Sequence, residues 1–138
     1  MKLCSACLLG VNCRFDGNNQ LNDKVLELSK KEVLIPVCPE QLGGEPTPRP
    51  GPKEIKNGRV VNKEGQDFTD ECEKGAKEVL KIANTLGIKE MISRQRSPSC
   101  GCGKIYDGTF SGKIIEGDGL TIKLLKKNGI KVISEEDL

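Results

Sequence analysis

Four of the seven cysteines stand in segments rich in glycine, proline or acidic residues, where core filling explains a thiol poorly: Cys7, Cys13, Cys38 and Cys100. Thiolates select zinc, copper(I) or iron–sulfur clusters. Structural zinc usually takes paired cysteines from two short knuckles. Single cysteines scattered over several segments instead suit an iron–sulfur cluster. The pattern therefore predicts a cluster held by loops that are distant in the sequence.

The other cysteines carry weaker signals for metal binding. Cys4 and Cys7 have the C-x-x-C spacing, but both fall in a predicted strand, where they would point to opposite faces. We therefore expect them not to form a joint site, and zinc stays the alternative metal. Cys4 and Cys72 are expected to be buried apolar side chains. Cys102 could be a core residue or a ligand.

The chain contains no histidine, so proton transfer must use another side chain. Glu40 lies two residues after a loop cysteine and is the candidate general acid or base, a solvated glutamate being the alternative. Ser97 and Ser99 precede Cys100 and could hydrogen-bond a substrate or simply form a turn. Four arginines could line an anionic or carbonyl-rich pocket, although each alone could be a surface charge: Arg14, Arg49, Arg94 and Arg96.

Short apolar runs alternate with amphipathic segments that would position these residues. The apolar runs predict four strands, at 2–6, 33–37, 88–93 and 130–133. Helical spacing and capping residues predict three helices, at 22–31, 69–86 and 120–127. The first helix is expected to face inward with Val25, Leu26 and Leu28.

Turn residues mark the connections between these elements. Asn57-Gly58 predicts a hairpin over 54–62, because this pair favours the type I′ turn. Asp107-Gly108 suggests a second hairpin-like turn. The proline-rich segment 39–53 is expected to be a functional loop, since long loops in small domains are rarely idle.

The alternation of strands and helices predicts an α/β fold over residues 1–138, taken as one domain. We expect a Rossmann-like open parallel sheet with helices on both faces and long site-bearing loops. The carboxyl ends of parallel strands share one edge, where ligands bind. Loops leaving the first three strands all carry cysteine, so the four loop thiols are expected to meet at that edge.

Composition excludes several classes of function. The 22 basic and 20 acidic residues give a net charge of +2, too even for nucleic acid or a membrane surface to be an obligatory partner. Three Phe, one Tyr and no Trp argue against a base-stacking platform. No run approaches the ~20 apolar residues that span a bilayer. An odd number of cysteines fits a reducing, cytoplasmic location better than a disulfide framework.

Three sequence blocks together resemble the 2-thiouracil desulfurase family of iron–sulfur-dependent desulfidases. The first is residues 5–17 (SACLLGVNCRFDG), and the second is 36–40 (PVCPE) followed by Gly43-Gly44 and 46–49 (PTPR). The third is 97–101 (SPSCG) followed by 105–112 (IYDGTFSG). The resemblance covers nearly the whole chain in the family's order. One departure is Glu45, where an apolar residue would be expected.

The resemblance implies a 4Fe–4S cluster bound by three cysteines, with one iron left open. That iron would bind the sulfur of a thiolated nucleobase or similar small compound as a Lewis acid, as in conversion of 2-thiouracil to uracil. The cluster would carry the sulfur transiently as an extra sulfide while water replaces it on carbon. No net electron transfer is needed, so the reaction would be hydrolytic.

On this resemblance we expect Cys7, Cys13 and Cys100 to be the cluster ligands. Cys38 would face the open iron as a catalytic thiol or exchange into the ligand set. Glu40 would transfer protons, with Ser97 or Ser99 positioning the substrate. The sequence does not decide which of the four loop cysteines is the non-ligand, and Cys102 could compete as a ligand.

Two alternative functions use the same residues. The first is a sulfide carrier that holds sulfur on the cluster for a sulfur-acceptor protein, in tRNA thiolation or cluster assembly. The second is a zinc- or thiol-based binding module without catalysis. Metal analysis separates the second alternative from the others, and turnover assays separate the enzyme from the carrier.

Overall fold

A four-stranded parallel sheet forms the centre of the protein, in a computed structural model that describes all 138 residues. The strand order is β2 (Leu34–Val37), β1 (Lys2–Ser5), β5 (Glu90–Ser93) and β8 (Lys131–Ser134). All four strands were predicted, and the Rossmann-like α/β class is confirmed. β2 and β5, the next two strands of this sheet along the chain, lie on opposite sides of β1. The strand order therefore reverses at β1, and open parallel sheets bind ligands at such a reversal.

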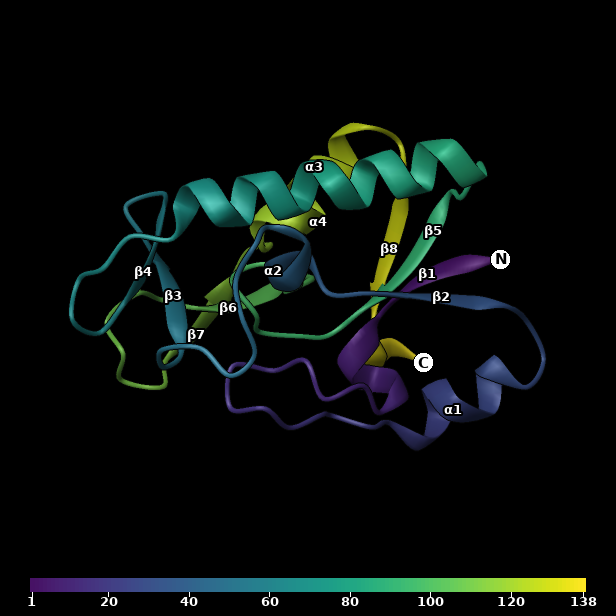
Figure 1. Cartoon of the computed structure of the whole chain (residues 1–138), viewed down its shortest axis with the longest axis horizontal. Coiled ribbons are helices and arrows are strands. Elements are labelled where there is room, and N and C mark those ends of the chain that lie inside the picture. The colour runs from purple at the N-terminus through teal and green to yellow at the C-terminus, as the bar shows by residue number, and fades with distance from the viewer.

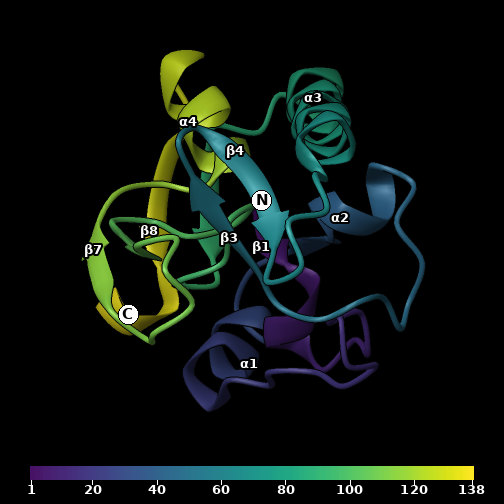
Figure 2. The same ribbon diagram turned by 90° about the vertical axis from the view of Figure 1, so that its left-hand side faces the viewer.

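Helices cover both faces of this sheet, as Figures 1 and 2 show. α3 (Thr69–Leu86) and α4 (Leu120–Lys127) lie together on one face, and α1 (Asp23–Ser29) lies on the other. The alternation of side chains along the strands serves both layers. Leu3 and Met91 pack on the α3 side, whereas Cys4 and Ile92 pack on the α1 side.

Local sequence signals explain where the helices begin and end. The Asn22 side chain accepts a hydrogen bond from the Val25 backbone N–H at 3.1 Å and so caps α1. Gly87 ends α3 in the left-handed conformation (φ 67°), which glycine adopts without steric cost. The prediction for the inner face of α1 was wrong in part: Val25 is buried, but Leu26 is exposed.

The predicted hairpin is confirmed as β3 (Lys53–Lys56) and β4 (Arg59–Asn62). Asn57 (φ 52°) and Gly58 (φ 75°) both have positive φ, as the type I′ turn requires. The second turn differs from expectation, because Asp107-Gly108 begins a longer connection between β6 (Lys104–Tyr106) and β7 (Ile114–Glu116). Both small sheets lie beyond the carboxyl ends of the main sheet (Figure 1).

Three short helical segments lie around the carboxyl edge of the sheet. The expected first strand ends at Ser5 and turns into the 3-10 helix η1 (Ala6–Leu9). The expected loop over 39–53 begins instead with a helical turn, α2 (Pro39–Leu42), whose first position suits proline. A second 3-10 helix, η2 (Glu135–Asp137), follows β8.

Pro36 lies within β2, although proline cannot donate to a strand ladder. β2 is an edge strand that pairs only with β1, so the missing N–H breaks no second ladder. None of the helices combines the length and apolar character needed to cross a membrane.

Candidate functional site

Four thiols line a single small cavity at the carboxyl edge of the sheet. Cys7 comes from η1, Cys13 from the loop that follows, Cys38 from the start of α2, and Cys100 from the loop after β5. The cavity has a volume of about 50 Å³, more than the ~10–15 Å³ that one water needs. The expected convergence of these four residues is therefore confirmed.

Burial and mutual contact raise the pKa of three of these thiols, Cys13, Cys38 and Cys100. Burial raises the pKa of Cys100 far above the ordinary thiol value, although a hydrogen bond with Ser5 opposes it. The contact with Cys13, followed by burial, also raises the pKa of Cys38 far above the ordinary thiol value. For Cys13, contact with Cys38 lowers the pKa, but contact with Cys7 and burial outweigh it and bring the value to about 11. Thiols in this state become ligands only when a metal displaces their protons.

The remaining cysteines lie away from this cavity. Cys4 and Cys72 are completely buried, as predicted, and burial raises the pKa of each to about 12. The Cys102 thiol contacts the Val132 carbonyl at 3.6 Å beside the main core and does not line the cavity. Cys4 and Cys7 do not share one strand as expected, since Cys7 is in η1, yet Cys4 still stays outside the cavity.

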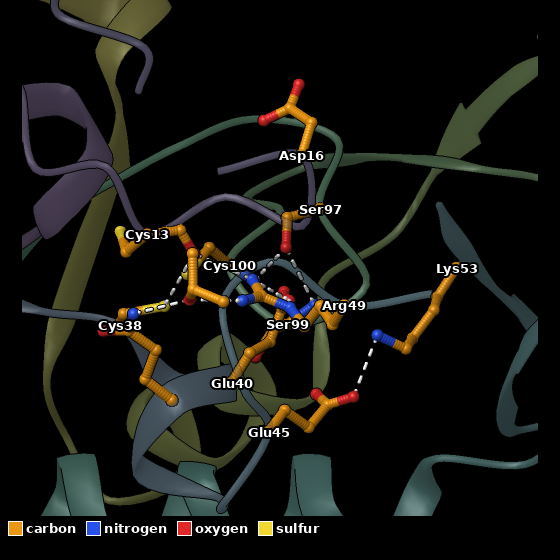
Figure 3. A network of polar contacts seen from close by, with 12 residues as sticks. Cys13, Asp16, Cys38, Glu40, Glu45, Arg49, Lys53, Ser97, Ser99 and Cys100 are labelled. Atoms are coloured by element: carbon orange, nitrogen blue, oxygen red, sulfur yellow. Dashed lines mark hydrogen bonds and ion pairs between the residues drawn. The ribbon is translucent and has the colours of Figure 1, made fainter. Parts of the chain in front are cut away.

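Glu40 reaches the cavity and is held by Arg49, a contact that the sequence did not reveal. Both Nε (2.8 Å) and Nη2 (2.6 Å) of Arg49 contact Oε2 of Glu40, while Oε1 accepts no hydrogen bond from the protein. The same guanidinium donates to the Cys13 carbonyl at 2.9 Å (Figure 3). One buried arginine thus connects the acidic residue to a cysteine loop.

α2, which carries Glu40, rests on α3 through two glycines in direct backbone contact. A Cβ on Gly75 would lie 1.9 Å from the Pro39 carbonyl oxygen, and one on Gly43 would lie 2.0 Å from that of Glu71. Any side chain at either position would push the two helices apart. The backbone contact therefore fixes the height of Glu40 above the sheet.

We expect Gly75→Ala to destabilise the fold by about 1–3 kcal/mol, because overpacking must displace α2. Thermal unfolding of this variant and of Lys74→Ala, an exposed neighbour on α3, provides the measurement and its control. An unfolding midpoint for Gly75→Ala equal to that of the wild type would contradict the close backbone contact.

The two candidate serines have different environments. The Ser97 hydroxyl accepts hydrogen bonds from the N–H groups of Ser99 (3.1 Å) and Cys100 (3.0 Å), and Ser97 lines the thiol cavity. Ser99 is completely buried and its hydroxyl pairs with that of Thr121 at 3.1 Å. The structure therefore brings Ser97 to the site but does not bring Ser99 there.

A larger cavity of about 360 Å³ adjoins the thiol cavity. The two share five lining residues, namely Arg14, Phe15, Glu40, Arg94 and Ser97. Arg96 lines the larger cavity and Arg49 the smaller one, so all four arginines singled out in the sequence border this site. Glu40 stands at the junction between the two spaces.

Two charged residues of β3, Lys53 and Glu54, also line the larger cavity. Neither was predicted from the sequence as a site residue. Glu54 accepts hydrogen bonds from the N–H groups of Gly108 (3.0 Å) and Phe110 (3.1 Å), and so attaches the β6–β7 connection to β3. Lys53 is buried and pairs with Glu45. The alternation of side chains along a four-residue strand does not indicate which distant residues Lys53 and Glu54 contact.

Comparison with known proteins gives consistent matches over nearly the whole chain. The family described as 2-thiouracil desulfurase matches residues 3–137. The uncharacterised protein YbbK of Bacillus subtilis strain 168 is 40% identical over 148 residues, which covers 100% of this chain and 97% of that protein. A solved structure of a 4Fe–4S-dependent thiouracil desulfidase, TudS, is similar with a TM-score of 0.92 at 40% identity, covering 99% of this chain and 91% of that one.

Proposed function

The chain belongs to the 2-thiouracil desulfurase family, and on that premise we propose that it removes sulfur from a thiolated nucleobase or a similar small thio-compound. The reaction depends on a 4Fe–4S cluster held by its cysteines. The single observation that supports this most strongly is the meeting of four loop thiols and one free carboxylate oxygen at a shared cavity.

The donor set fits such a cluster. Thiolates are the usual ligands of iron–sulfur clusters, and four thiols surround one hollow here. No three or more Cys, Asp or Glu side chains are grouped as ligands of a single metal ion would be. Thiols that come from separate segments and line one cavity suit a group of several atoms.

In this proposal Cys7, Cys13 and Cys100 hold the cluster. When bound, the cluster supplies a Lewis-acidic iron with an open position for the substrate sulfur. Cys38 lines the same cavity and would act as the catalytic thiol. The hydrogen bonds from Ser93 to the Cys100 carbonyl and from the Cys100 N–H to Ser97 keep that loop in place.

Glu40 acts on the attacking water. Arg49 occupies Oε2 of Glu40, which leaves Oε1 able to take a proton from a water in the adjoining cavity. The water oxygen forms a bond to the thiocarbonyl carbon, the carbon–sulfur bond breaks, and sulfur leaves as sulfide. The water supplies both protons and the oxygen, so the exchange needs no oxidant or reductant.

The larger cavity provides the space for the substrate body. Phe15 lines both cavities and gives the substrate space an apolar, aromatic side chain. Guanidinium groups of Arg14, Arg94 and Arg96 can donate hydrogen bonds to ring carbonyl groups. Ser97 lies close enough to both spaces to orient the substrate beside Glu40.

The deciding experiment measures iron, zinc and acid-labile sulfide in protein purified without oxygen. We expect about four iron and four sulfide per chain with broad brown absorbance, and then sulfide release from 2-thiouracil or its nucleosides. Stoichiometric zinc, or no metal after anaerobic reconstitution, would contradict the proposal. A loaded cluster with no turnover would favour a sulfide carrier serving a sulfur-acceptor protein.

A further inference from the structure

Glu45 and Lys53 form a buried ion pair beside the proposed site. Lys53 Nζ lies 2.9 Å from Glu45 Oε1, and the two side chains are 3% and 5% exposed. The Lys53 ammonium also lies 4.4 Å from the centre of the Phe68 ring. Neither Glu45 oxygen takes part in a hydrogen bond of good geometry, so the ammonium is the sole partner of this carboxylate.

Stability alone does not explain such a pair. Removing two charges from water costs more than an isolated ion pair usually returns, and well-packed apolar residues often serve as well or better. The lack of further hydrogen bonds on Glu45 makes the balance worse. The presence of the pair is therefore better explained by how it arranges the segments around it than by the free energy of unfolding.

The pair connects the segment that carries Glu40 to the hairpin that borders the larger cavity. The Glu45 N–H donates to the Glu40 carbonyl at 3.1 Å and closes the turn after α2. On the other side, Lys53 is the first residue of β3. The ion pair thus fixes the distance between the α2 turn and the cavity wall.

The same pair balances charge around Arg49. Arg49 contacts Oε2 of Glu40 through Nε and Nη2, whereas the Glu45 carboxylate contacts Lys53. Figure 3 shows Glu40, Arg49, Glu45 and Lys53 in one neighbourhood, with the Glu45 carboxylate turned toward Lys53. While Lys53 engages Glu45, Arg49 keeps Glu40 as its carboxylate partner.

We infer that Glu45 and Lys53 are positioning residues that hold the Glu40 carboxylate at the junction of the two cavities. The inference rests on the proposed function for the role of Glu40. Without Lys53, Glu45 is free to compete for Arg49 and displaces Glu40. Without Glu45, Lys53 is left as an uncompensated buried charge and the α2 turn loses its connection to β3.

The test compares Glu45→Leu, Lys53→Met and the double variant with the wild type. Each single variant buries an unpaired charge, so the unfolding midpoint should fall by roughly 10 °C. The double variant has no buried charge at this position and should recover most of that loss. Its kcat should nevertheless stay at least about tenfold below the wild-type value, with KM changed by less than about threefold, because the α2 turn that carries Glu40 has lost its connection to β3.

The matched control is the exposed ion pair between Glu27 of α1 and Lys30, which directly follows α1. The double variant Glu27→Leu with Lys30→Met should keep both kcat and the unfolding midpoint near the wild-type values. A double variant at 45 and 53 with wild-type kcat would overturn the inference. Turnover of the wild type tests the proposed function separately. A crystal structure of Lys53→Met is the readout without activity: with Glu45 free to approach Arg49, Glu40 should leave its 2.6 Å contact with Arg49, and an unchanged contact would also overturn the inference.

Discussion

Glu40→Gln is expected to lower kcat by about 10²–10⁴-fold while iron and sulfide content stay at wild-type levels. Glutamine keeps the size of the side chain and can still accept a hydrogen bond from Arg49 through its amide oxygen. It cannot take a proton from water at the position of Oε1, the oxygen that the protein leaves free. The loss should therefore affect chemistry and leave cluster binding intact.

The measurement is the rate of sulfide release at saturating substrate, together with the visible spectrum of each preparation. Glu64→Gln is a suitable control, because this carboxylate is exposed on the turn after β4 and forms no ion pair. Unchanged turnover in Glu40→Gln would remove this residue from the mechanism. Loss of the cluster would instead assign it a part in assembly.

Cys100→Ala is expected to abolish cluster binding, whereas Cys72→Ala should retain it. Cys100 lines the thiol cavity, but Cys72 is completely buried in α3 and is not among the residues lining it. Removal of the Cys72 sulfur should cost only about 1 kcal/mol of stability. Iron and sulfide analysis after anaerobic reconstitution, with the absorbance spectrum, measures the difference.

The same series separates the ligands from the fourth loop thiol. We expect Cys7→Ala and Cys13→Ala to lose the cluster, and Cys38→Ala to keep iron and sulfide but to lose turnover. A Cys38 variant without cluster, beside a Cys7 or Cys13 variant that retains it, would exchange their proposed roles. Loss of the cluster in Cys72→Ala would overturn its assignment to the core.

Local signals in the sequence determined the elements and the direction of the chemistry. Apolar runs marked the four parallel strands, Asn22 and Gly87 marked helix ends, and Asn57-Gly58 marked the hairpin. These signals act over a few residues, through φ preferences, capping and side-chain periodicity. Because parallel strands share one carboxyl edge, the loop cysteines could be placed together before any contact was known.

Only the tertiary structure decided which polar groups act on one another at that edge. Ser97 and Ser99 have nearly the same sequence surroundings, yet only Ser97 lines the cavity. The partner of Glu40, Arg49, is nine residues away across a proline-rich turn, and α2, which carries Glu40, is placed by its backbone contact with Gly75 of α3.

Glu45 is another residue whose contact partner the sequence does not reveal. The comparison with the family's sequence blocks marked it as a departure where an apolar residue would be expected, and the structure pairs it with Lys53. Burial and pairing of this kind depend on how separate segments pack, because a charge is stable inside a protein only where another segment supplies its partner. The sequence therefore predicted candidate reacting groups, and packing between distant segments determined the partners and orientation that these groups have in the structure.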